Sequence, residues 1–219
     1  MKPIISCLNL KGGCGKSSTI VNLGGILVDK KKRPILIDLD EQQSATQWST
    51  QGGDKFPFPV IPLSIKTAAK VKGQIERLSN KHKADIILID TPPQLEDDAL
   101  IAALLSDVVL IPVSPSPLDL WAARKVIDTI KEARQERGGN LPMAVLIPSR
   151  VMKRTTLAKD IKESLKAFDE PISPPISLRV AIAEAAIAGL PISCYAPNSP
   201  SHREFMDLWK FINSEMQKF

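Results

Sequence analysis

A glycine-rich loop between an apolar run and a helix-like segment constrains the fold of this chain more than any other feature. The loop reads K-G-G-C-G-K-S-S over residues 11–18, with the apolar run at residues 3–8 and the helix-like segment at 19–28. A strand, a glycine loop and a helix in this order form the context of a phosphate-binding loop. Glycines let backbone N–H groups turn toward phosphate oxygens, and the helix N-terminus attracts anions. The sequence therefore predicts that this loop binds the phosphates of a nucleotide.

Two side chains of the loop supply the chemistry that this prediction requires. Lys16 is expected to reach the β- and γ-phosphates, and the Ser17 hydroxyl is expected to bind Mg²⁺. The residues predicted to surround the phosphates are Gly12, Gly13, Cys14, Gly15, Lys16, Ser17 and Ser18. The alternative is a glycine-rich turn with two surface lysines, which the flanking strand and helix disfavour.

Strand-like and helix-like segments alternate along the chain. Short apolar runs, typical of strands buried on both faces, lie at residues 4–10, 34–39, 60–63, 86–90, 108–113, 143–148 and 192–194. Helix-like segments lie at residues 17–30, 65–80, 96–105, 118–137, 155–168, 181–188 and 202–218. The pattern predicts an α/β fold, a mostly parallel twisted sheet of about seven or eight strands with helices on both faces. A length of 219 residues suits a single domain, residues 1–219.

Three carboxylates stand where apolar runs end. Asp38 and Asp40 follow the run at residues 34–39, and Asp90 closes the run at 86–90. Because ligands bind outside the carboxyl ends of parallel strands, we expect these carboxylates to converge with the glycine loop. Asp90 is predicted to organise Mg²⁺ through bound waters, since this ion tends to keep several of them. For Asp40, a role as the N-cap of a helix starting near residue 42 is an alternative.

The loop departs from the common pattern G-x-x-x-x-G-K-S/T, because Leu10 occupies the first glycine position and Lys11 follows it. The resulting K-G-G-x-G-K-S/T resembles the deviant Walker A box of the ParA/MinD family of P-loop ATPases. The segment D-L-D-E-Q at residues 38–42 resembles a second box of that family, D-x-D-P-Q, with Glu41 replacing the proline. The resemblance implies the P-loop NTPase fold of that family, with ATP and Mg²⁺ as cofactors.

The resemblance also implies roles for individual residues. Lys11 is expected to contact the nucleotide of a partner subunit, and Asp40 to orient the water that attacks the γ-phosphate. With Lys16 they form the expected catalytic set, because phosphoryl transfer depends on positioning and charge stabilisation. Asp38 is expected near the waters of the metal, which makes Ser17, Asp38 and Asp90 the expected metal site.

Two further regions are assigned by resemblance. Residues 111–119 imply a switch-linked surface at a dimer face, or equally a rigid connection with Asp119 near a helix start. Residues 148–150 and 197–200 imply a purine-contact region, in which Arg150 and Pro197 are the expected nucleotide contacts.

The function implied by the resemblance is an ATP-dependent switch with slow intrinsic hydrolysis. ATP bridges two subunits of a homodimer; ParA-type members bind DNA without sequence preference in that state, and a ParB-like or cargo-adaptor protein stimulates hydrolysis. We therefore expect a cytoplasmic, nucleoid-associated protein, in keeping with the absence of a signal peptide or span-length apolar stretch in this sequence. The cargo stays open between a plasmid and a protein compartment such as a carboxysome.

Charge permits DNA binding without demanding it. The formal net charge is +5 and the pI is about 9.1. The candidate DNA-contacting cations lie late in the chain: Lys153, Arg154, Arg179, Arg203 and Lys210. Solvated surface charge is the alternative for each of them.

Other functions within the same resemblance are a MinD-like membrane-associated ATPase, an iron–sulfur member and a metabolic ATP-dependent ligase. An apolar stripe over residues 205–219 has balanced flanking charges, whereas membrane-surface helices are usually rich in Lys and Arg. The stripe therefore predicts a helix docked on the sheet. Only Cys194 follows Asp90, which disfavours a cluster. Lys11 and the box at residues 38–43 favour the switch over the ligase.

Overall fold

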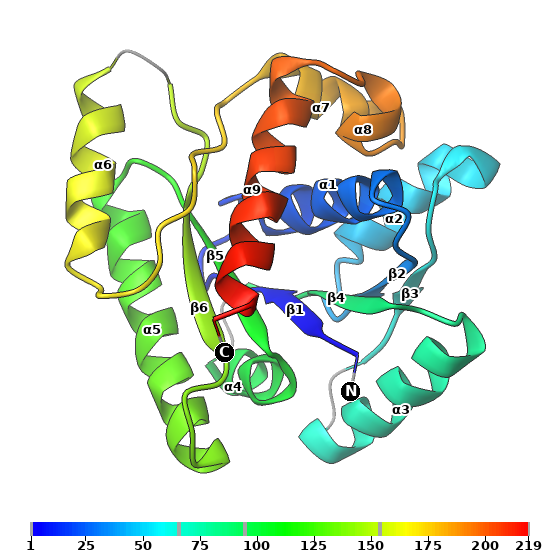
Figure 1. The fold of residues 1–219 in the computed structure, drawn as a ribbon, viewed down its shortest axis with the longest axis horizontal. Coiled ribbons are helices and arrows are strands. Elements are labelled where there is room, and N and C mark those ends of the chain that lie inside the picture. Colours follow the sequence, from blue (N-terminus) through cyan, green and yellow to red (C-terminus); the bar gives the residue numbers. More distant parts are fainter. Residues whose placement is uncertain (1, 65–66, 94–95, 153–154, 219) are drawn as a thin grey trace.

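Six parallel strands form one sheet in the computed structural model, which describes residues 2–64, 67–93, 96–152 and 155–218 (Figure 1). The strands are β1 (Ile4–Cys7), β2 (Pro34–Asp38), β3 (Val60–Pro62), β4 (Ile86–Asp90), β5 (Val108–Val113) and β6 (Met143–Pro148). Their order across the sheet is β3-β2-β4-β1-β5-β6, and each neighbouring pair is parallel. β1 is thus central, and the glycine loop leaves the sheet from its carboxyl end.

Helices cover both faces of this sheet. They are α1 (Lys16–Asp29), α2 (Ser44–Gly52), α3 (Ala68–Lys81), α4 (Glu96–Leu105), α5 (Pro117–Arg137), α6 (Thr156–Lys166), α7 (Val180–Ile187), α8 (Ile192–Tyr195) and α9 (Pro200–Met216). α1, α2, α7, α8 and α9 share a core with one face, and α3 to α6 pack on the other. α9 crosses α1 on the first of these faces (Figure 1). The predicted α/β class is therefore confirmed.

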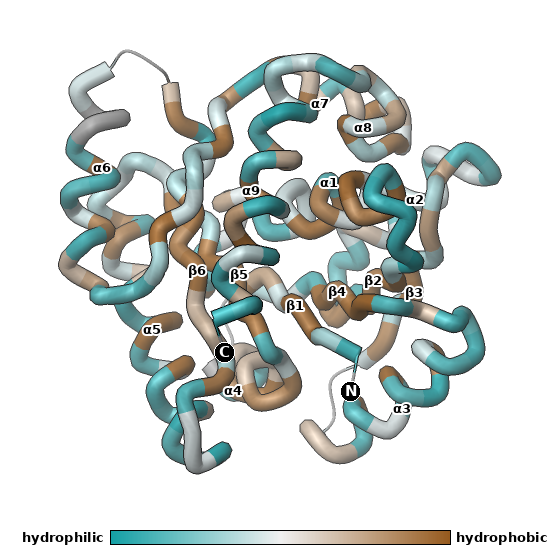
Figure 2. The backbone as a smooth tube through the Cα atoms, viewed as in Figure 1, coloured by the Kyte–Doolittle hydropathy of each residue, from teal (hydrophilic) through white to brown (hydrophobic). Residues whose placement is uncertain are grey.

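The strands are buried on both sides, and successive residues alternate between the two cores. Leu36 and Leu88 pack in the core under α1, whereas Ile35, Ile37 and Ile87 pack in the core under α3. In Figure 2 the central strands are accordingly mostly brown, the colour of hydrophobic residues, and lie in the interior of the molecule. Each fully buried aliphatic side chain contributes about 1.5–3 kcal/mol. Burial on two faces is why the strands read as continuous apolar runs in the sequence.

The strand predicted at residues 192–194 is wrong. These residues begin α8, a single helical turn whose first N–H, that of Ile192, donates to Asn22 Oδ1 on α1 at 2.6 Å. The segment packs on α1 instead of extending the sheet, so the described residues form six strands and not seven or eight. The open side of β6 is partly covered by an isolated bridge from Leu146 to Ile172, and a second bridge, Val151 to Ser177, lies beyond the end of the strand.

The sequence indicated α2, which follows the box at residues 38–43, only through the alternative of a helix starting near residue 42. The helix is polar, and Ala45 and Trp48 are the residues it buries. The indole N–H of Trp48 donates to the carbonyl of Leu190 at 3.1 Å. At the helix end, a Cβ built on Gly52 would lie 2.1 Å from the carbonyl oxygen of Gly189. The backbone of α2 therefore touches the backbone of the turn between α7 and α8 directly.

The C-terminal helix α9 has the docked position that its balanced charges predicted. Phe205, Leu208 and Ile212 of the apolar stripe are buried in the core shared with α1. Among the described residues, no helix combines the length and the apolar character needed to cross a membrane.

Candidate functional site

The glycine loop connects β1 to α1 and is tied to the neighbouring strand β5 by Asn9. The Asn9 amide donates to the carbonyl of Pro112 at 2.8 Å, and its Oδ1 accepts from the Lys11 N–H at 2.9 Å. Gly13 and Gly15 have φ values of 73° and 101°, a region that favours glycine. The loop conformation therefore depends on the glycines that the sequence singles out.

Lys16 begins α1 and points back into the loop. Its side chain is largely buried, and its amine donates to the carbonyl of Lys11 at 3.2 Å. Cys14 is also buried, with its thiol 3.2 Å from the same carbonyl oxygen. A buried cation held by a neutral carbonyl gains most from an anion, so the loop is arranged to receive a phosphate oxygen.

Asp90 ends β4 beside the loop and is completely buried. Among the described residues, neither of its carboxylate oxygens has a hydrogen-bond partner. The pKa of Asp90 is raised to about 7, chiefly by burial and also by the charge of Asp38, against the lowering effect of the nearby Ser17 hydroxyl and Lys16 amine. An unpartnered buried carboxylate is costly unless a cation compensates it.

This donor set suits Mg²⁺ held partly through waters. No three His, Cys, Asp or Glu side chains within the described ranges gather as a direct metal-ligand cluster. Mg²⁺ typically uses one or two carboxylates together with waters and substrate phosphates. Asp90 and the Ser17 hydroxyl therefore fit the predicted ion.

Asp38 lies directly beside Asp90, because the two residues are register partners in β2 and β4. Its Oδ2 accepts hydrogen bonds from both the backbone N–H and the hydroxyl of Thr46, each at 2.8 Å. Its Oδ1 accepts from the Asp40 N–H at 3.2 Å. Burial raises the pKa of the Asp38 carboxyl, and the bonds from Thr46 oppose that rise. Asp38 thus fixes the first turn of α2 to the end of β2.

Asp40 caps a turn and not the helix. Its Oδ1 accepts from the Gln42 N–H at 2.9 Å, whereas the N-cap of α2 is Gln43. The alternative of Asp40 as helix N-cap is therefore wrong. The side chain is half-buried and borders a cleft also lined by Glu41 and Asp98. It lies at the same edge of the sheet as Asp38 and Asp90, where the carboxyl ends of β2 and β4 meet.

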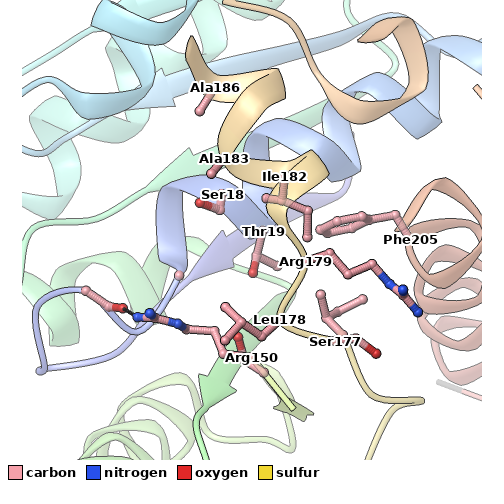
Figure 3. Close-up of a pocket in the computed structure, with 14 residues that line it drawn as sticks. Ser18, Thr19, Arg150, Ser177, Leu178, Arg179, Ile182, Ala183, Ala186 and Phe205 are labelled. Carbon is pink, nitrogen blue, oxygen red and sulfur yellow. Dashed lines mark hydrogen bonds between the residues drawn. The ribbon is translucent and has the colours of Figure 1, made fainter. Parts of the chain in front are cut away.

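A pocket on the other side of the loop contains Arg150 (Figure 3). The Arg150 guanidinium donates to the carbonyl of Gly13 at 2.7 Å, and the Ser149 hydroxyl to that of Cys14 at 3.3 Å. The apolar wall is formed by Leu178, Ile182, Ala183, Ala186 and Phe205, and the loop side by Gly13, Gly15, Ser18 and Thr19. A pocket with an apolar wall next to a phosphate loop suits a planar base.

Pro197 does not reach this pocket. It lies between α8 and α9, next to Asn198, whose N–H donates to His202 Nδ1. The other ring nitrogen of His202 is 3.0 Å from Asp29 Oδ2, at the carboxyl end of α1. The glycine loop lies at the opposite end of that helix, about 20 Å away. The structure therefore brings Arg150 to the loop but leaves Pro197 apart from it.

Of the predicted DNA-contacting cations, Arg179 pairs with Glu204 and Lys210 pairs with Asp207. The Arg179 guanidinium lies 3.1 Å from Glu204 Oε1 and points away from the pocket in Figure 3. Glu204 also accepts from the N–H and the hydroxyl of Ser177. Arg203 and Lys210 are exposed on α9, and the predictions for Lys153 and Arg154 lie outside the described residues.

Lys11 stands at the rim of the loop. Its amine lies 2.5 Å from Asp119 Oδ2 in the first turn of α5, and its side chain is 39% exposed against 3% for Asp119. Lys11, Gly12, Asp119 and Met152 border a shallow depression on this face. Leu118 and Trp121 are large apolar side chains exposed on the same helix end. The segment at residues 111–119 thus leads directly into the face that carries Lys11.

Sequence reasoning missed several residues that shape the site. Asn9 and Thr46 act through hydrogen bonds to the loop and to Asp38, and Phe205 forms a pocket wall from α9. A polar residue at the end of the apolar run, two positions before the glycine loop, was a usable signal for Asn9. No local signal marks Phe205, which reads as one member of an apolar stripe.

The site defines a P-loop nucleotide-binding protein: a glycine loop at a helix N-terminus, a buried lysine within it, and an unpartnered carboxylate at the end of the adjacent strand. The family model described as the CobQ/CobB/MinD/ParA nucleotide binding domain matches residues 5–192, and the chain belongs to this family.

Similar proteins span most of this chain. One is the maintenance of carboxysome distribution protein A of Halothiobacillus neapolitanus, 27% identical, with 86% of this chain and 85% of that protein covered. Another is the chromosome-partitioning ATPase Soj of Thermus thermophilus, 27% identical, with 98% and 96% covered. The solved structure of apo McdA from Cyanothece superposes with a TM-score of 0.79 at 17% identity, covering 96% of this chain and 99% of that one. This last likeness concerns the fold.

Proposed function

We propose that this protein is a ParA-type, Mg-ATP-dependent dimeric switch ATPase that binds DNA without sequence preference in its ATP state. Residues 1–219 act as one ATPase domain. The switch segregates or positions a cargo together with a partner protein that stimulates hydrolysis. Two similar proteins support the cargo classes, since one is named for carboxysome distribution and the other for chromosome partitioning.

The observation that supports this proposal best is the distribution of three charged groups around one loop. Lys16 is buried within the loop, Asp90 is buried and unpartnered behind it, and Lys11 stands at its exposed rim. The first two suit phosphate and Mg²⁺ inside one subunit. The third, paired with Asp119 at the rim, reaches a nucleotide that a second subunit presents once that pair opens.

Each residue has a defined part in the reaction. Backbone N–H groups of the loop and the Lys16 amine bind the phosphate oxygens, and Lys11 of the partner subunit neutralises charge that develops on them. Asp40 holds and orients the attacking water, and Asp38 keeps the Asp40 turn in place through its bond to the Asp40 N–H. Bound Mg²⁺, held at Ser17 and Asp90, supplies Lewis-acid stabilisation of the phosphoryl oxygens. Arg150 and the apolar pocket wall orient the base.

The experiment that tests the proposal measures mass in solution and duplex DNA binding with ATP, ADP or no nucleotide, at low and moderate salt. A dimer that forms with ATP and binds random-sequence duplex in a salt-sensitive manner supports it. An ATP dimer that binds anionic vesicles and no DNA would indicate a membrane-associated positioning ATPase. ATP binding without a dimer would indicate a metabolic enzyme of the same family.

A further inference from the structure

A dense group of cations lies at the edge of the sheet opposite the nucleotide site. α1 runs into β2 and α3 runs into β4 through two turns, at residues 29–33 and 81–85, which are adjacent because β2 pairs with β4. The Asp85 N–H donates to the Arg33 carbonyl at 2.9 Å, and the Arg33 guanidinium donates to Asp85 Oδ1 at 2.7 Å. The Lys2 amine donates to the carbonyl of Ser79 at 3.2 Å. We call these two turns and Lys2 the basic edge.

The basic edge carries the charge imbalance of the whole molecule. Its cations are Lys2, Lys30, Lys31, Lys32, Arg33, Lys81 and Lys83, and its carboxylates are Asp29 and Asp85. Seven cations against two carboxylates equal the formal net charge of +5 of the entire chain. Of these cations, six are exposed and Lys2 is half-buried. Both turns are hydrophilic in Figure 2, at the right-hand ends of α1 and α3.

One lysine in each turn, Lys31 and Lys83, has a backbone conformation that is unusual for lysine. Lys31 and Lys83 have φ values of 58° and 49°, in the left-handed region where glycine is favoured. Each turn closes its helix in the same way: the Lys32 N–H donates to the Leu27 carbonyl at 3.0 Å, and the Ala84 N–H to that of Ser79 at 2.9 Å. This Schellman arrangement usually has glycine at the position these lysines occupy. Cations in a last helical turn are explained by the helix dipole, but lysine in a left-handed backbone is not.

We propose that the basic edge is a contact surface for the phosphate backbone of duplex DNA. Phosphate recognition needs clustered, exposed cations and no base-specific group. Surface binding to lipid usually adds apolar side chains. The large apolar side chains exposed in the described part of the chain (Leu118, Trp121, Met152, Leu178, Val180, Ile187 and Tyr195) all lie in other segments. Charge and composition therefore favour a nucleic acid over a membrane.

The inference rests on the proposed function and adds a location to it. The two turns lead into β2 and β4, and Asp38 and Asp90 are the last residues of these strands. Each strand has five residues, so the basic edge and the nucleotide site lie about 16 Å apart, one at each end of the strands. A dimer joined at its nucleotides carries two basic edges at opposite poles, so nucleotide raises DNA affinity through avidity where one long duplex reaches both edges.

The glycine preference of the two positions provides a test variant that keeps its fold. The double substitution Lys31→Gly and Lys83→Gly removes two cations while giving each turn the residue that it favours. We expect an unchanged or higher melting temperature and unchanged ATP turnover without DNA. Duplex binding of the ATP state should weaken on the order of tenfold at moderate salt, with the log–log salt slope reduced by about 0.9 for each lysine lost. The matched control, Lys131→Gln with Lys162→Gln on α5 and α6, should bind DNA like the wild type.

The outcomes separate this inference from the proposed function. If the wild type binds duplex and the glycine variant binds it with the same affinity and slope, the basic edge is overturned and the switch stands. If the wild type binds no duplex in any nucleotide state, both fail. If the glycine variant keeps duplex binding and loses only binding to vesicles containing phosphatidylserine, the surface belongs to lipid and the inference is overturned.

Discussion

The Lys11 amine lies 2.5 Å from the Asp119 carboxylate, so the lysine expected to reach a partner's nucleotide is held by its own subunit. Asp119 is almost fully buried at the first turn of α5, whereas Lys11 is partly exposed. The bond must open before Lys11 crosses to a second subunit. In the proposed switch, the ion pair is therefore expected to oppose formation of the ATP-bridged dimer.

Replacing Asp119 by Asn should favour that dimer. An exposed or partly exposed ion pair is worth about 0.2–1 kcal/mol, and two such pairs open per dimer. The dimer Kd with ATP is therefore expected to fall roughly two- to thirtyfold, which analytical ultracentrifugation can measure. Lys11→Ala serves as the opposite variant, expected to bind ATP as a monomer without dimerisation or turnover. An ATP dimer of Lys11→Ala would remove the cross-subunit role of this lysine.

Lys16→Ala should weaken ATP binding severely while leaving the fold intact. The amine bonds a neutral loop carbonyl in this structure, so its removal costs the protein itself little. Loss of charge-assisted bonds to phosphate should raise the ATP Kd by about two orders of magnitude in calorimetry. Lys162→Ala, an exposed lysine on α6, is the control. Retained ATP affinity in Lys16→Ala would contradict the assignment of the loop.

Asp40→Ala should trap the ATP dimer. The half-buried carboxylate is the one expected to orient the attacking water, and losing such a group costs about 10²-fold or more in rate. Phosphate release should fall by that factor while ATP still drives dimerisation. Glu41→Ala removes the same charge from the same turn and should keep normal turnover. Equal rates in the two variants would exclude Asp40 from catalysis.

Asp90 should make the stability of the nucleotide-free protein fall as pH rises from about 4 to about 7. Its pKa is about 7 in the folded state, against 3.8 for an ordinary aspartate, because burial penalises the charged form. The folded state thus binds more protons in this window, and the contribution is favourable below pH 4 and lost through pH 7. The loss is at most about 4 kcal/mol.

Thermal unfolding of Asp90→Asn provides the measurement. The variant should melt at a higher temperature than the wild type at pH 8, by a smaller margin at pH 5, and at nearly the same temperature at pH 3. Mg-ATP should stabilise the wild type more than the variant, because a cation compensates the carboxylate. Identical pH profiles for both proteins would show that Asp90 does not titrate in this range.

Local patterns in the sequence predicted the strands, the glycine loop and the carboxylates that end β2 and β4, because each follows from a few neighbouring residues. Long-range contacts were not predictable in this way. Lys11 meets Asp119 across 108 positions, and Asn22 captures the N–H of Ile192 across 170. The bond between Asn22 and Ile192 holds the apolar segment at residues 192–194 against α1, where it forms a helical turn and not a strand. α2 was absent from the predicted helices and entered only as an alternative for Asp40, because it buries Ala45 and Trp48 alone and so shows no apolar period.

The contact between Gly52 and Gly189 leaves no room for even a methyl group between two backbones. Gly52 ends α2, whose first turn Asp38 anchors; Gly189 follows α7, which forms a wall of the pocket that contains Arg150. Neither helix can slide toward the other, and the Trp48 bond to Leu190 resists their separation. A movement of α2 beside Asp38 is therefore expected to move α7 and the wall of the Arg150 pocket with it, because the two backbones are in direct contact.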